Sequence, residues 1–181
     1  AADLLSQAEH DPLATAVLVT PSGSLAEAVV EEIERQIRSL SRAAVIAQAL
    51  EARGAIVVVE SLDAGVELVN RLAPEHLEVM VEDGDDLLPR LRNAGMILLG
   101  EGAPVAFCDY GAGPTHVLPT GGAARFCAPL SVGDCLNHTN YLAVSGRARR
   151  SLAESLEPLA EIEGFGAHAA SMRLRKEVRH G

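Results

Sequence analysis

The first hundred residues alternate between short apolar segments and longer segments with the apolar spacing of amphipathic helices. Short, almost wholly apolar segments are typical of buried strands. Strands are expected at residues 15–20 (TAVLVT), 55–59 (AIVVV), 77–81 (LEVMV) and 96–99 (MILL). Helices are expected at about residues 1–10, 25–37, 42–52, 61–72 and 85–92.

Residues at the ends of the expected helices support this division. Residues 21–24 (PSGS) supply a turn and an N-cap, and Ser61 caps a later helix. Gly54 is a normal C-terminal stop, and Pro74 ends the helix that Ser61 begins. Strands that are apolar throughout and alternate with helices imply a mostly parallel sheet with helices on both faces. The pattern therefore predicts an α/β fold.

The character of the chain changes at residue 100. Residues 100–133 hold seven glycines and four prolines and show little helical periodicity. An irregular segment of this length inside a compact domain is usually functional. Two further helices are expected after it, at about residues 149–160 and 167–179.

Composition excludes several classes of function. The 181 residues carry a net charge of −10 without an obvious Lys/Arg face, so a nucleic-acid partner is not expected. No apolar run reaches the roughly 18 residues that a membrane span needs, and no signal-peptide pattern is present. Three cysteines without C-x-x-C spacing argue against a disulfide framework and fit a reducing cytoplasm.

The strongest candidate for acid–base chemistry is the pair Glu75–His76, which follows Pro74 directly. Adjacent side chains do not share a face of a helix or strand, so both cannot point into one core. An imidazole titrates near neutrality and a neighbouring carboxylate can activate water, as general acid–base catalysis requires. The alternative is a solvated polar pair after a helix-ending proline.

Five other residues carry side chains that bind metals or small polar ligands. Gln7 and His10 are three positions apart and could reach one point from a helix face; alternatively they form a solvated helix end. Asp109 and His116 lie in the Gly/Pro-rich segment, where Asp109 could instead bond its own backbone in a turn. His168 stands near the start of the last helix, where it could be a capping or surface imidazole.

Amide, imidazole and carboxylate donors without a thiolate pair suit a zinc site that keeps a position open for substrate. Cys108 could be a nucleophile, but no motif supports that role. No nucleotide-binding fingerprint is present, because residues 111–114 (GAGP) open no helix. Since the candidates are scattered, their spacing alone assigns neither a metal nor a reaction.

Taken together, several of these segments resemble the histidinol dehydrogenase family. In chain order they are residues 3–10 (DLLSQAEH), 74–78 (PEHLE), 109–122 (DYGAGPTHVLPTGG) with 123–126 (AARF), 130–132 (LSV) and 163–168 (EGFGAH). Their order and separation match the family, and the resemblance spans essentially the whole chain. Because the family's enzymes are much longer, the chain resembles their C-terminal portion.

The resemblance implies a partial Rossmann-like α/β domain at 1–128 and a small helical dimerisation segment at 129–181. It also implies a cytoplasmic homodimer that oxidises L-histidinol through L-histidinaldehyde to L-histidine, the last steps of histidine biosynthesis, with zinc and NAD. The residues that bind NAD are not identified by the resemblance.

The resemblance assigns roles to individual residues. Glu75 and His76 fall on the catalytic pair. The zinc-ligand positions are Gln7, His10, Asp109 and His168. The substrate-contacting positions are these four ligands together with His76, His116 and Glu163. In the family, the positions of Glu163 and His168 act in the active site of the partner subunit.

Two residues depart from the family pattern, and two alternatives stay open. Cys108 stands where the family usually has Gly, and Thr115 where it often has Asn. A Cβ and thiol beside Asp109 could disturb a tight turn or add a competing soft ligand. The chain could be a metal-binding or dimerisation fragment without activity, since the family keeps most NAD contacts in its N-terminal half. It could also be a relative that oxidises another small polyol or amino alcohol.

Overall fold

The computed structural model describes residues 1–177, which fold as two compact units. The N-terminal unit is Ala1–Cys135 and the C-terminal unit is Leu136–Gly181. The boundary expected from the sequence, at residue 128/129, lies slightly earlier. Part of the helix expected at 167–179 lies outside the described residues.

The strands of the N-terminal unit form two parallel pairs. They are β1 (Val17–Thr20) with β2 (Ala55–Val58), and β3 (His76–Val79) with β4 (Met96–Leu99). Val17 lies opposite Ala55, and His76 lies opposite Met96. The α/β class and the parallel direction are therefore confirmed, although the four strands belong to two separate two-stranded sheets. Strand β3 begins one residue before the expected position, so His76 belongs to the strand.

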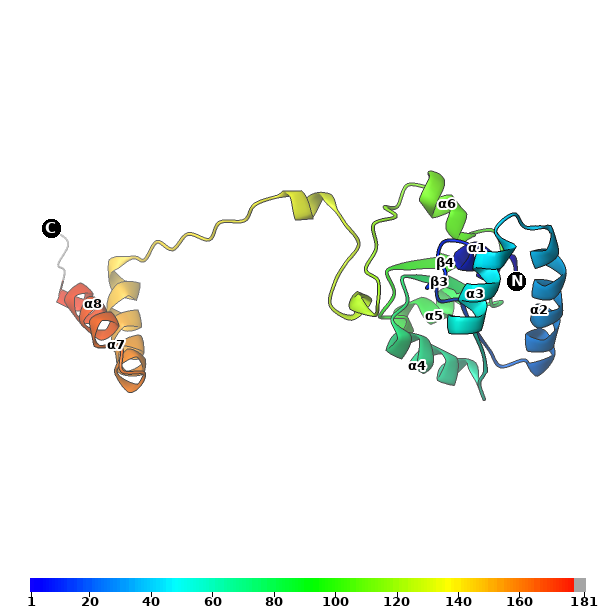
Figure 1. Cartoon of the computed structure of the whole chain (residues 1–181). Helices are drawn as coiled ribbons and strands as arrows, with labels where there is room; N and C mark the ends of the chain where they lie inside the picture. Colours follow the sequence, from blue (N-terminus) through cyan, green and yellow to red (C-terminus); the bar gives the residue numbers. More distant parts are fainter. Residues whose placement is uncertain (178–181) are drawn as a thin grey trace. The chain divides into compact units, whose positions relative to one another are not determined.

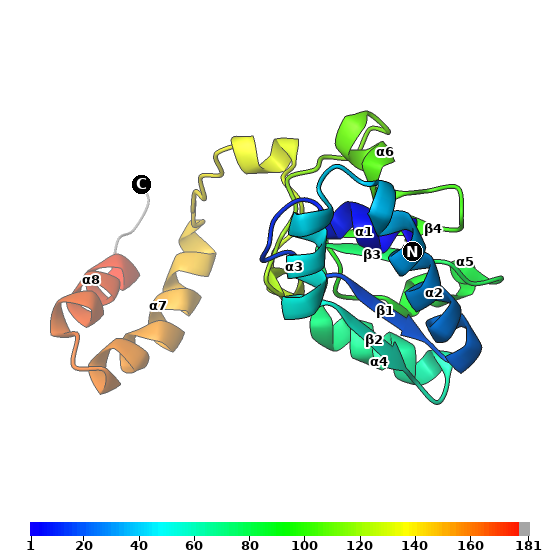
Figure 2. The same cartoon turned by 45° about the vertical axis from the view of Figure 1, so that its right-hand side comes forward.

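Helices flank the strands of the N-terminal unit. They are α1 (Ala2–Ala8), α2 (Gly23–Gln36), α3 (Ala43–Arg53), α4 (Leu62–Leu72), α5 (Gly84–Leu87) and α6 (Val105–Tyr110). Helices α2 and α4 pack against the β1–β2 pair. Short 3₁₀ turns are η1 (Ile37–Ser39), η2 (Leu88–Arg90), η3 (Ala123–Arg125) and η4 (Val132–Cys135). Figure 2 places α3 on one side of the strands and α4 on the other. Across the described residues, every helix is too short or too polar to cross a membrane.

The expected helix caps are present. Ser22 Oγ accepts a hydrogen bond from the Leu25 amide at 3.2 Å, and Ser61 Oγ accepts one from the Ala64 amide at 3.2 Å. Each serine satisfies a backbone N–H that has no partner inside its helix. Local sequence thus determines where α2 and α4 begin.

Two small apolar clusters form the core of the N-terminal unit. The first joins α1 to α3 through Leu5, Ala8, Ile46 and Ala49. The second joins α4, β3 and the segment after η2 through Val66, Val79 and Leu91. Figure 1 shows α1 and α3 side by side, as this packing requires. These clusters fix α1 and β3, the two elements that carry the first candidate residues.

The expectation of an irregular segment at 100–133 is wrong for residues 105–110, which form α6. Pro104 stands at its N-cap, and the carboxylate of Glu78 accepts a hydrogen bond from the Val105 amide. A helix of one to two turns is unstable alone and depends on such tertiary contacts. Periodicity could not reveal α6 because its stabilising partner is distant in sequence.

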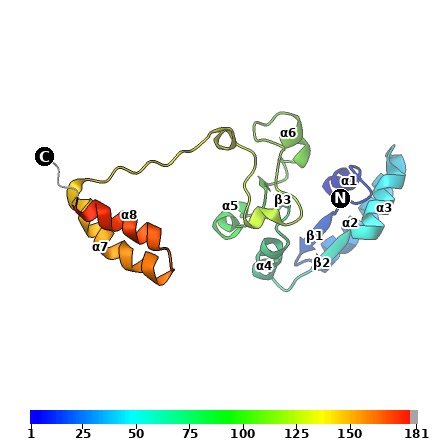
Figure 3. The same ribbon diagram turned by 60° about the vertical axis from the view of Figure 1, so that its left-hand side comes forward.

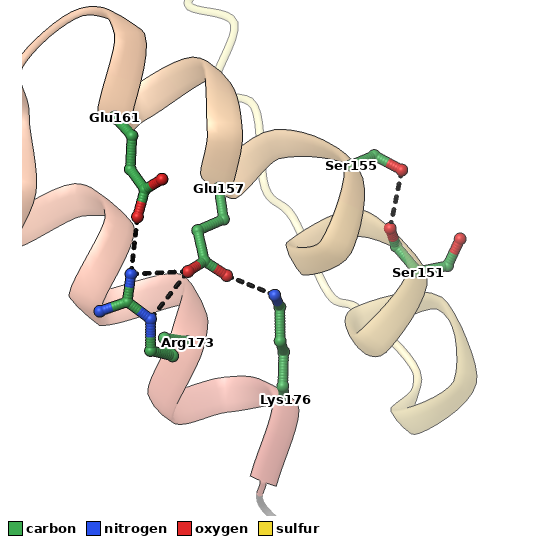
Figure 4. A network of polar contacts seen from close by, with 6 residues as sticks. All are labelled: Ser151, Ser155, Glu157, Glu161, Arg173 and Lys176. Carbon is green, nitrogen blue, oxygen red and sulfur yellow. Dashed lines mark hydrogen bonds and ion pairs between the residues drawn. The ribbon is translucent and has the colours of Figure 1, made fainter.

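The C-terminal unit is a pair of helices, α7 (Gly146–Ile162) and α8 (Gly166–Glu177). Figure 3 shows the two helices side by side, joined by a tight turn. Gly164 in this turn has φ +77°, a conformation that other residues adopt only with strain. Figure 4 shows the polar contacts between the helices, which centre on Glu157 of α7 and Arg173 of α8.

Candidate active site

Glu75 and His76 lie where the chain enters β3. The Glu75 carbonyl accepts the Met96 amide at 2.8 Å, so parallel pairing with β4 already includes the backbone of Glu75. His76 is the first residue of β3. Neighbouring strand residues point to opposite faces, so the carboxylate and the imidazole leave the strand in different directions. Both side chains are half-buried.

The imidazole of His76 holds an unpaired polar atom. Its Nε2 is buried and has no hydrogen-bond partner within residues 1–177. Buried polar atoms in native proteins nearly always have a partner, so an exception calls for an explanation. A ligand hydroxyl or N–H group that reached this nitrogen would not have to displace a hydrogen bond from residues 1–177.

Gly95 brings the segment that carries His116 close to Glu75 and His76, the candidate catalytic pair. A Cβ at residue 95 would lie 2.7 Å from the Glu75 carbonyl oxygen and 3.2 Å from Cδ of Pro119. The backbone at Glu75 and the loop at Pro119 therefore meet across this glycine. His116 itself is exposed, three residues before the buried Pro119. The sequence offered one signal for Gly95, a lone glycine directly before a strand.

Gln7 and His10 lie at the C-terminal end of α1. The helix ends at Ala8, and the His10 amide still donates to the Gln7 carbonyl at 3.4 Å. Arg42 holds this end, donating to the carbonyls of Glu9 at 2.7 Å and His10 at 3.4 Å. A cavity of about 310 Å³ is lined by Glu9, His10 and Arg42. His10 is exposed beside this cavity, whereas Gln7 is half-buried.

Asp109 belongs to α6, near its C-terminal end, and is half-buried. The tight turn in which Cys108 was expected to cause strain is absent, because residue 108 is helical and buried. Positive φ among the described non-glycine residues occurs only at Ala73. The Cβ of Cys108 is therefore accommodated without backbone strain.

Glu78 is a charged residue near the site that the sequence did not single out. It lies two residues after His76 in β3, and its Oε1 accepts the Val105 amide at 3.1 Å. Burial raises the pKa of the Glu78 carboxyl, and the nearby charge of Asp3 raises it further, while the bond from Val105 opposes both effects. Glu78 thus lies among α1, β3 and α6, the elements that carry Gln7, His76 and Asp109.

Glu163 and His168 lie together at one end of the C-terminal unit. Glu163 is the C-cap residue of α7, and His168 lies in the first turn of α8. Both are exposed. The His168 ring lies 5.4 Å from the Phe165 ring, between centroids. The turn between α7 and α8 therefore presents both side chains at the same tip.

The proposed zinc ligands are divided between the two units. Gln7, His10 and Asp109 belong to the N-terminal unit and His168 to the C-terminal unit. Within residues 1–177, no three His, Cys, Asp or Glu side chains are close enough together to hold a metal ion. The donors themselves, an amide oxygen, two imidazole nitrogens and a carboxylate, are ones that zinc accepts. The chemistry of the set fits zinc.

Comparison with known proteins assigns the family. The sequence model of the family described as histidinol dehydrogenase matches residues 1–176. This chain belongs to the histidinol dehydrogenase family. The histidinol dehydrogenase of Caldanaerobacter subterraneus subsp. tengcongensis is 48% identical over 175 residues, which are 97% of this chain and 41% of that protein. That of Moorella thermoacetica is 49% identical over 177 residues, 98% of this chain and 42% of that protein.

A solved structure agrees. The crystal structure of histidinol dehydrogenase from Elizabethkingia anophelis superposes with a TM-score of 0.86 at 29% sequence identity, covering 96% of this chain and 40% of that one. The chain therefore spans about 40% of the length of these histidinol dehydrogenases. The resemblance noted in the sequence is confirmed at the level of the family.

Proposed function

We propose that this chain is the part of a histidinol dehydrogenase that carries the catalytic pair and the zinc ligands. The proposed reaction converts L-histidinol through L-histidinaldehyde to L-histidine, the last steps of histidine biosynthesis. The observation that carries the proposal is the buried Nε2 of His76 beside Glu75, which no described residue pairs with, in a chain of this family. NAD, when bound, would supply the hydride acceptor for each oxidation.

His76 is the general base of the first oxidation. Its Nε2 takes the hydroxyl proton of histidinol as the hydride leaves the same carbon, and the product is the aldehyde. Because Nε2 has no partner within the described residues, it can meet the substrate hydroxyl without first breaking a protein hydrogen bond. The proton then passes to solvent, which restores the neutral imidazole for the second step.

Glu75 acts between the two oxidations. Its carboxylate removes a proton from water as the water oxygen attacks the aldehyde carbon, the carbonyl oxygen takes up a proton from solvent, and the product is a geminal diol. His76 then takes a hydroxyl proton from the diol as the second hydride leaves, and the carboxylic acid forms. The two groups have different tasks: His76 accepts protons from the hydroxyl groups of the substrate, and Glu75 activates water.

The remaining residues hold the substrate. Zinc, when bound by Gln7, His10, Asp109 and His168, would fix histidinol by its imidazole and amino nitrogens. Its contribution is positioning, which can supply a large part of the rate enhancement. His116 and Glu163 suit an imidazole-bearing amino alcohol, because a carboxylate and an imidazole can pair with the cationic and polar groups of such a substrate.

The decisive experiment separates the two oxidations. We expect Glu75→Gln, in an enzyme of full family length carrying this segment, to slow histidinaldehyde oxidation about 100-fold or more, because the base that activates water is lost. Histidinol oxidation should change only a few-fold. Reduction of NAD with each substrate separately measures both rates. Equal loss of the two activities would contradict the division of labour, and retention of both would contradict the role of Glu75.

We further propose a cytoplasmic homodimer in which Glu163 and His168 of each chain complete the active site of the other. Apolar residues exposed on α7 support a helical interface, because Leu152, Leu156 and Leu159 recur at the spacing of one helix face. No nucleic-acid or membrane partner is part of the proposal.

A second candidate follows from the length of the chain. Because it spans about 41% of a typical relative, it could bind zinc and pair with another chain without turning over substrate alone. Titration of NAD against the isolated chain tests this alternative by calorimetry. Absence of NAD binding together with intact zinc binding would favour it over an autonomous enzyme.

A further inference from the structure

Glu78 connects the strand of the catalytic base to the helix of a proposed metal ligand. Its Oε1 accepts a hydrogen bond from the Val105 amide at 3.1 Å. Val105 is the first residue of α6, and Asp109 belongs to the same helix. The contact joins residues that are 27 positions apart in the chain. This hydrogen bond is therefore a tertiary contact, and α6 cannot form it from its own residues.

The place of Glu78 in β3 relates it to His76. Residues two apart in a strand point to the same face and lie about 6.6 Å apart along it. Glu78 and His76 therefore share one face of β3, and α6 is bonded to that face. A change in the length of the Glu78 side chain would therefore change the position of α6 relative to the His76 imidazole.

Helix α6 depends on an external partner. It runs only from Val105 to Tyr110, and Pro104 at its N-cap provides no side-chain hydrogen bond. The first amides of a helix have no partner inside it, and a carboxylate at that end also favours the helix dipole. Glu78 supplies both effects from another element. The Glu78 side chain is half-buried, so the contact is partly shielded from water.

We propose that Glu78 is a positioning residue that holds α6, and with it Asp109, in place relative to His76. The inference rests on the proposed function for the role of Asp109, but the contact itself does not. Glu78 touches neither metal nor substrate in this proposal. It acts through the backbone of Val105, so what matters is the reach of the side chain and its acceptor oxygen.

Two conservative substitutions distinguish the effect of the length of the Glu78 side chain from the effect of its charge. Glu78→Asp keeps the charge but is one methylene too short to reach Val105 from the same backbone position. Glu78→Gln keeps the reach and an acceptor oxygen but loses the charge. Glu82, exposed just after β3, provides the matched control Glu82→Asp. If Glu78 positions α6, the Asp variant is defective and the Gln variant resembles the unsubstituted chain.

The reactivity of the Cys108 thiol shows whether α6 stays docked, and this measurement needs no metal. It is buried in α6, whereas Cys127 and Cys135 are exposed. With Ellman's reagent the metal-free chain should show two fast thiols and one slow thiol. In Glu78→Asp we expect the slow thiol to react at least about tenfold faster, equivalent to about 1.4 kcal/mol of helix docking. In Glu78→Gln and Glu82→Asp the thiol should stay slow.

Cobalt(II) reports on Asp109. Titration of the metal-free chain with cobalt, followed by its visible absorption band, should give a dissociation constant at least about tenfold higher in Glu78→Asp and unchanged in Glu78→Gln. If the cobalt band of the unsubstituted chain did not depend on Asp109, the proposed zinc site would be contradicted. The role of Glu78 in holding α6 would still be tested by the thiol measurement, which needs no metal.

Three outcomes would overturn the inference. The first is a slow Cys108 in Glu78→Asp. The second is a fast-reacting Cys108 in Glu78→Gln, since the charge of the carboxylate, and not only the reach of the side chain, would then be responsible. The third is loss of the far-ultraviolet circular dichroism of the whole chain in Glu78→Asp, which would make Glu78 a general stabilising residue.

Discussion

Glu75 and His76 are held by backbone contacts that leave no room for a side chain at residue 95. The amides of Gly95 and Met96 donate to the carbonyls of Pro74 and Glu75 at 3.0 and 2.8 Å. Just before them, Ala73 adopts φ 50° and is fully buried. Left-handed non-glycine residues are costly and concentrate at functional sites. The candidate catalytic pair thus enters β3 from a strained, tightly packed turn.

We expect Gly95→Ala to lower the free energy of unfolding by about 1–3 kcal/mol, because the new methyl group would overlap the Glu75 carbonyl and force the backbone to move. Urea denaturation measures the change. Gly102→Ala is the matched control, since no atom lies within 4 Å of its Cβ position. It should stay within about 0.5 kcal/mol of the unsubstituted chain. Similar losses in both variants would show that the crowding at residue 95 is not responsible.

At the scale of elements, α7 and α8 are joined by ion pairs around one largely buried carboxylate. Arg173 Nη2 lies 2.7 Å from Oε1 of Glu157 and 2.8 Å from Oε1 of Glu161. Lys176 pairs with the other oxygen of Glu157. Hydrogen bonds from Lys176 and then Arg173 lower the pKa of the Glu157 carboxyl. The ionised form is therefore favoured in the folded pair of helices (Figure 4).

A carboxyl whose pKa is lower in the folded state stabilises that state above its unfolded pKa, about 4.3 for Glu, and loses the effect as the pH falls. We therefore expect the amide NMR signals of α8 to disappear at lower temperature at pH 3 than at pH 7. In Glu157→Gln the two temperatures should be closer together, mainly because stability at pH 7 falls. Glu154→Gln, an exposed change on the same helix, should keep the full pH effect. An undiminished pH effect in Glu157→Gln would assign it to other groups.

For the whole molecule, the candidate ligands belong to two units of one chain. His10 belongs to the N-terminal unit and His168 to the C-terminal unit. A shared site in a symmetric dimer would take His10 from one subunit and His168 from the other. A site within one chain would take both from the same subunit. These arrangements differ in what happens when two defective variants are mixed.

We expect His10→Ala and His168→Ala each to lose tight zinc binding. Refolded together in equal amounts, they should regain about one quarter of the sites, because half of the dimers are mixed and each mixed dimer has one complete site. Metal analysis after gel filtration measures the stoichiometry. His138→Ala, at an exposed histidine outside the candidate site, should bind fully. No recovery on mixing would place all ligands in one chain.

Local patterns in the sequence were sufficient for most of the fold. The strand expected at 96–99 matches β4 (Met96–Leu99), and the caps at Ser22 and Ser61 are present. These signals depend on neighbouring residues, so they can be read without the fold. The sequence did not reveal α6, because the partner of its first amide is the distant Glu78. The sequence did not reveal the crowding at Gly95 either, because that crowding arises from Glu75 and Pro119.

The roles of Gln7, His10, Asp109, His116, Glu163 and His168 stay predictions from the resemblance. The sequence by itself determined the α/β class, the parallel strands and the family, because apolar periodicity, caps and ordered motifs are local or collinear features. Only the tertiary structure decided that Nε2 of His76 is buried and has no partner among residues 1–177, and that Glu78 joins β3 to α6. Burial and long-range hydrogen bonds arise between segments that packing brings together, so no stretch of sequence contains them.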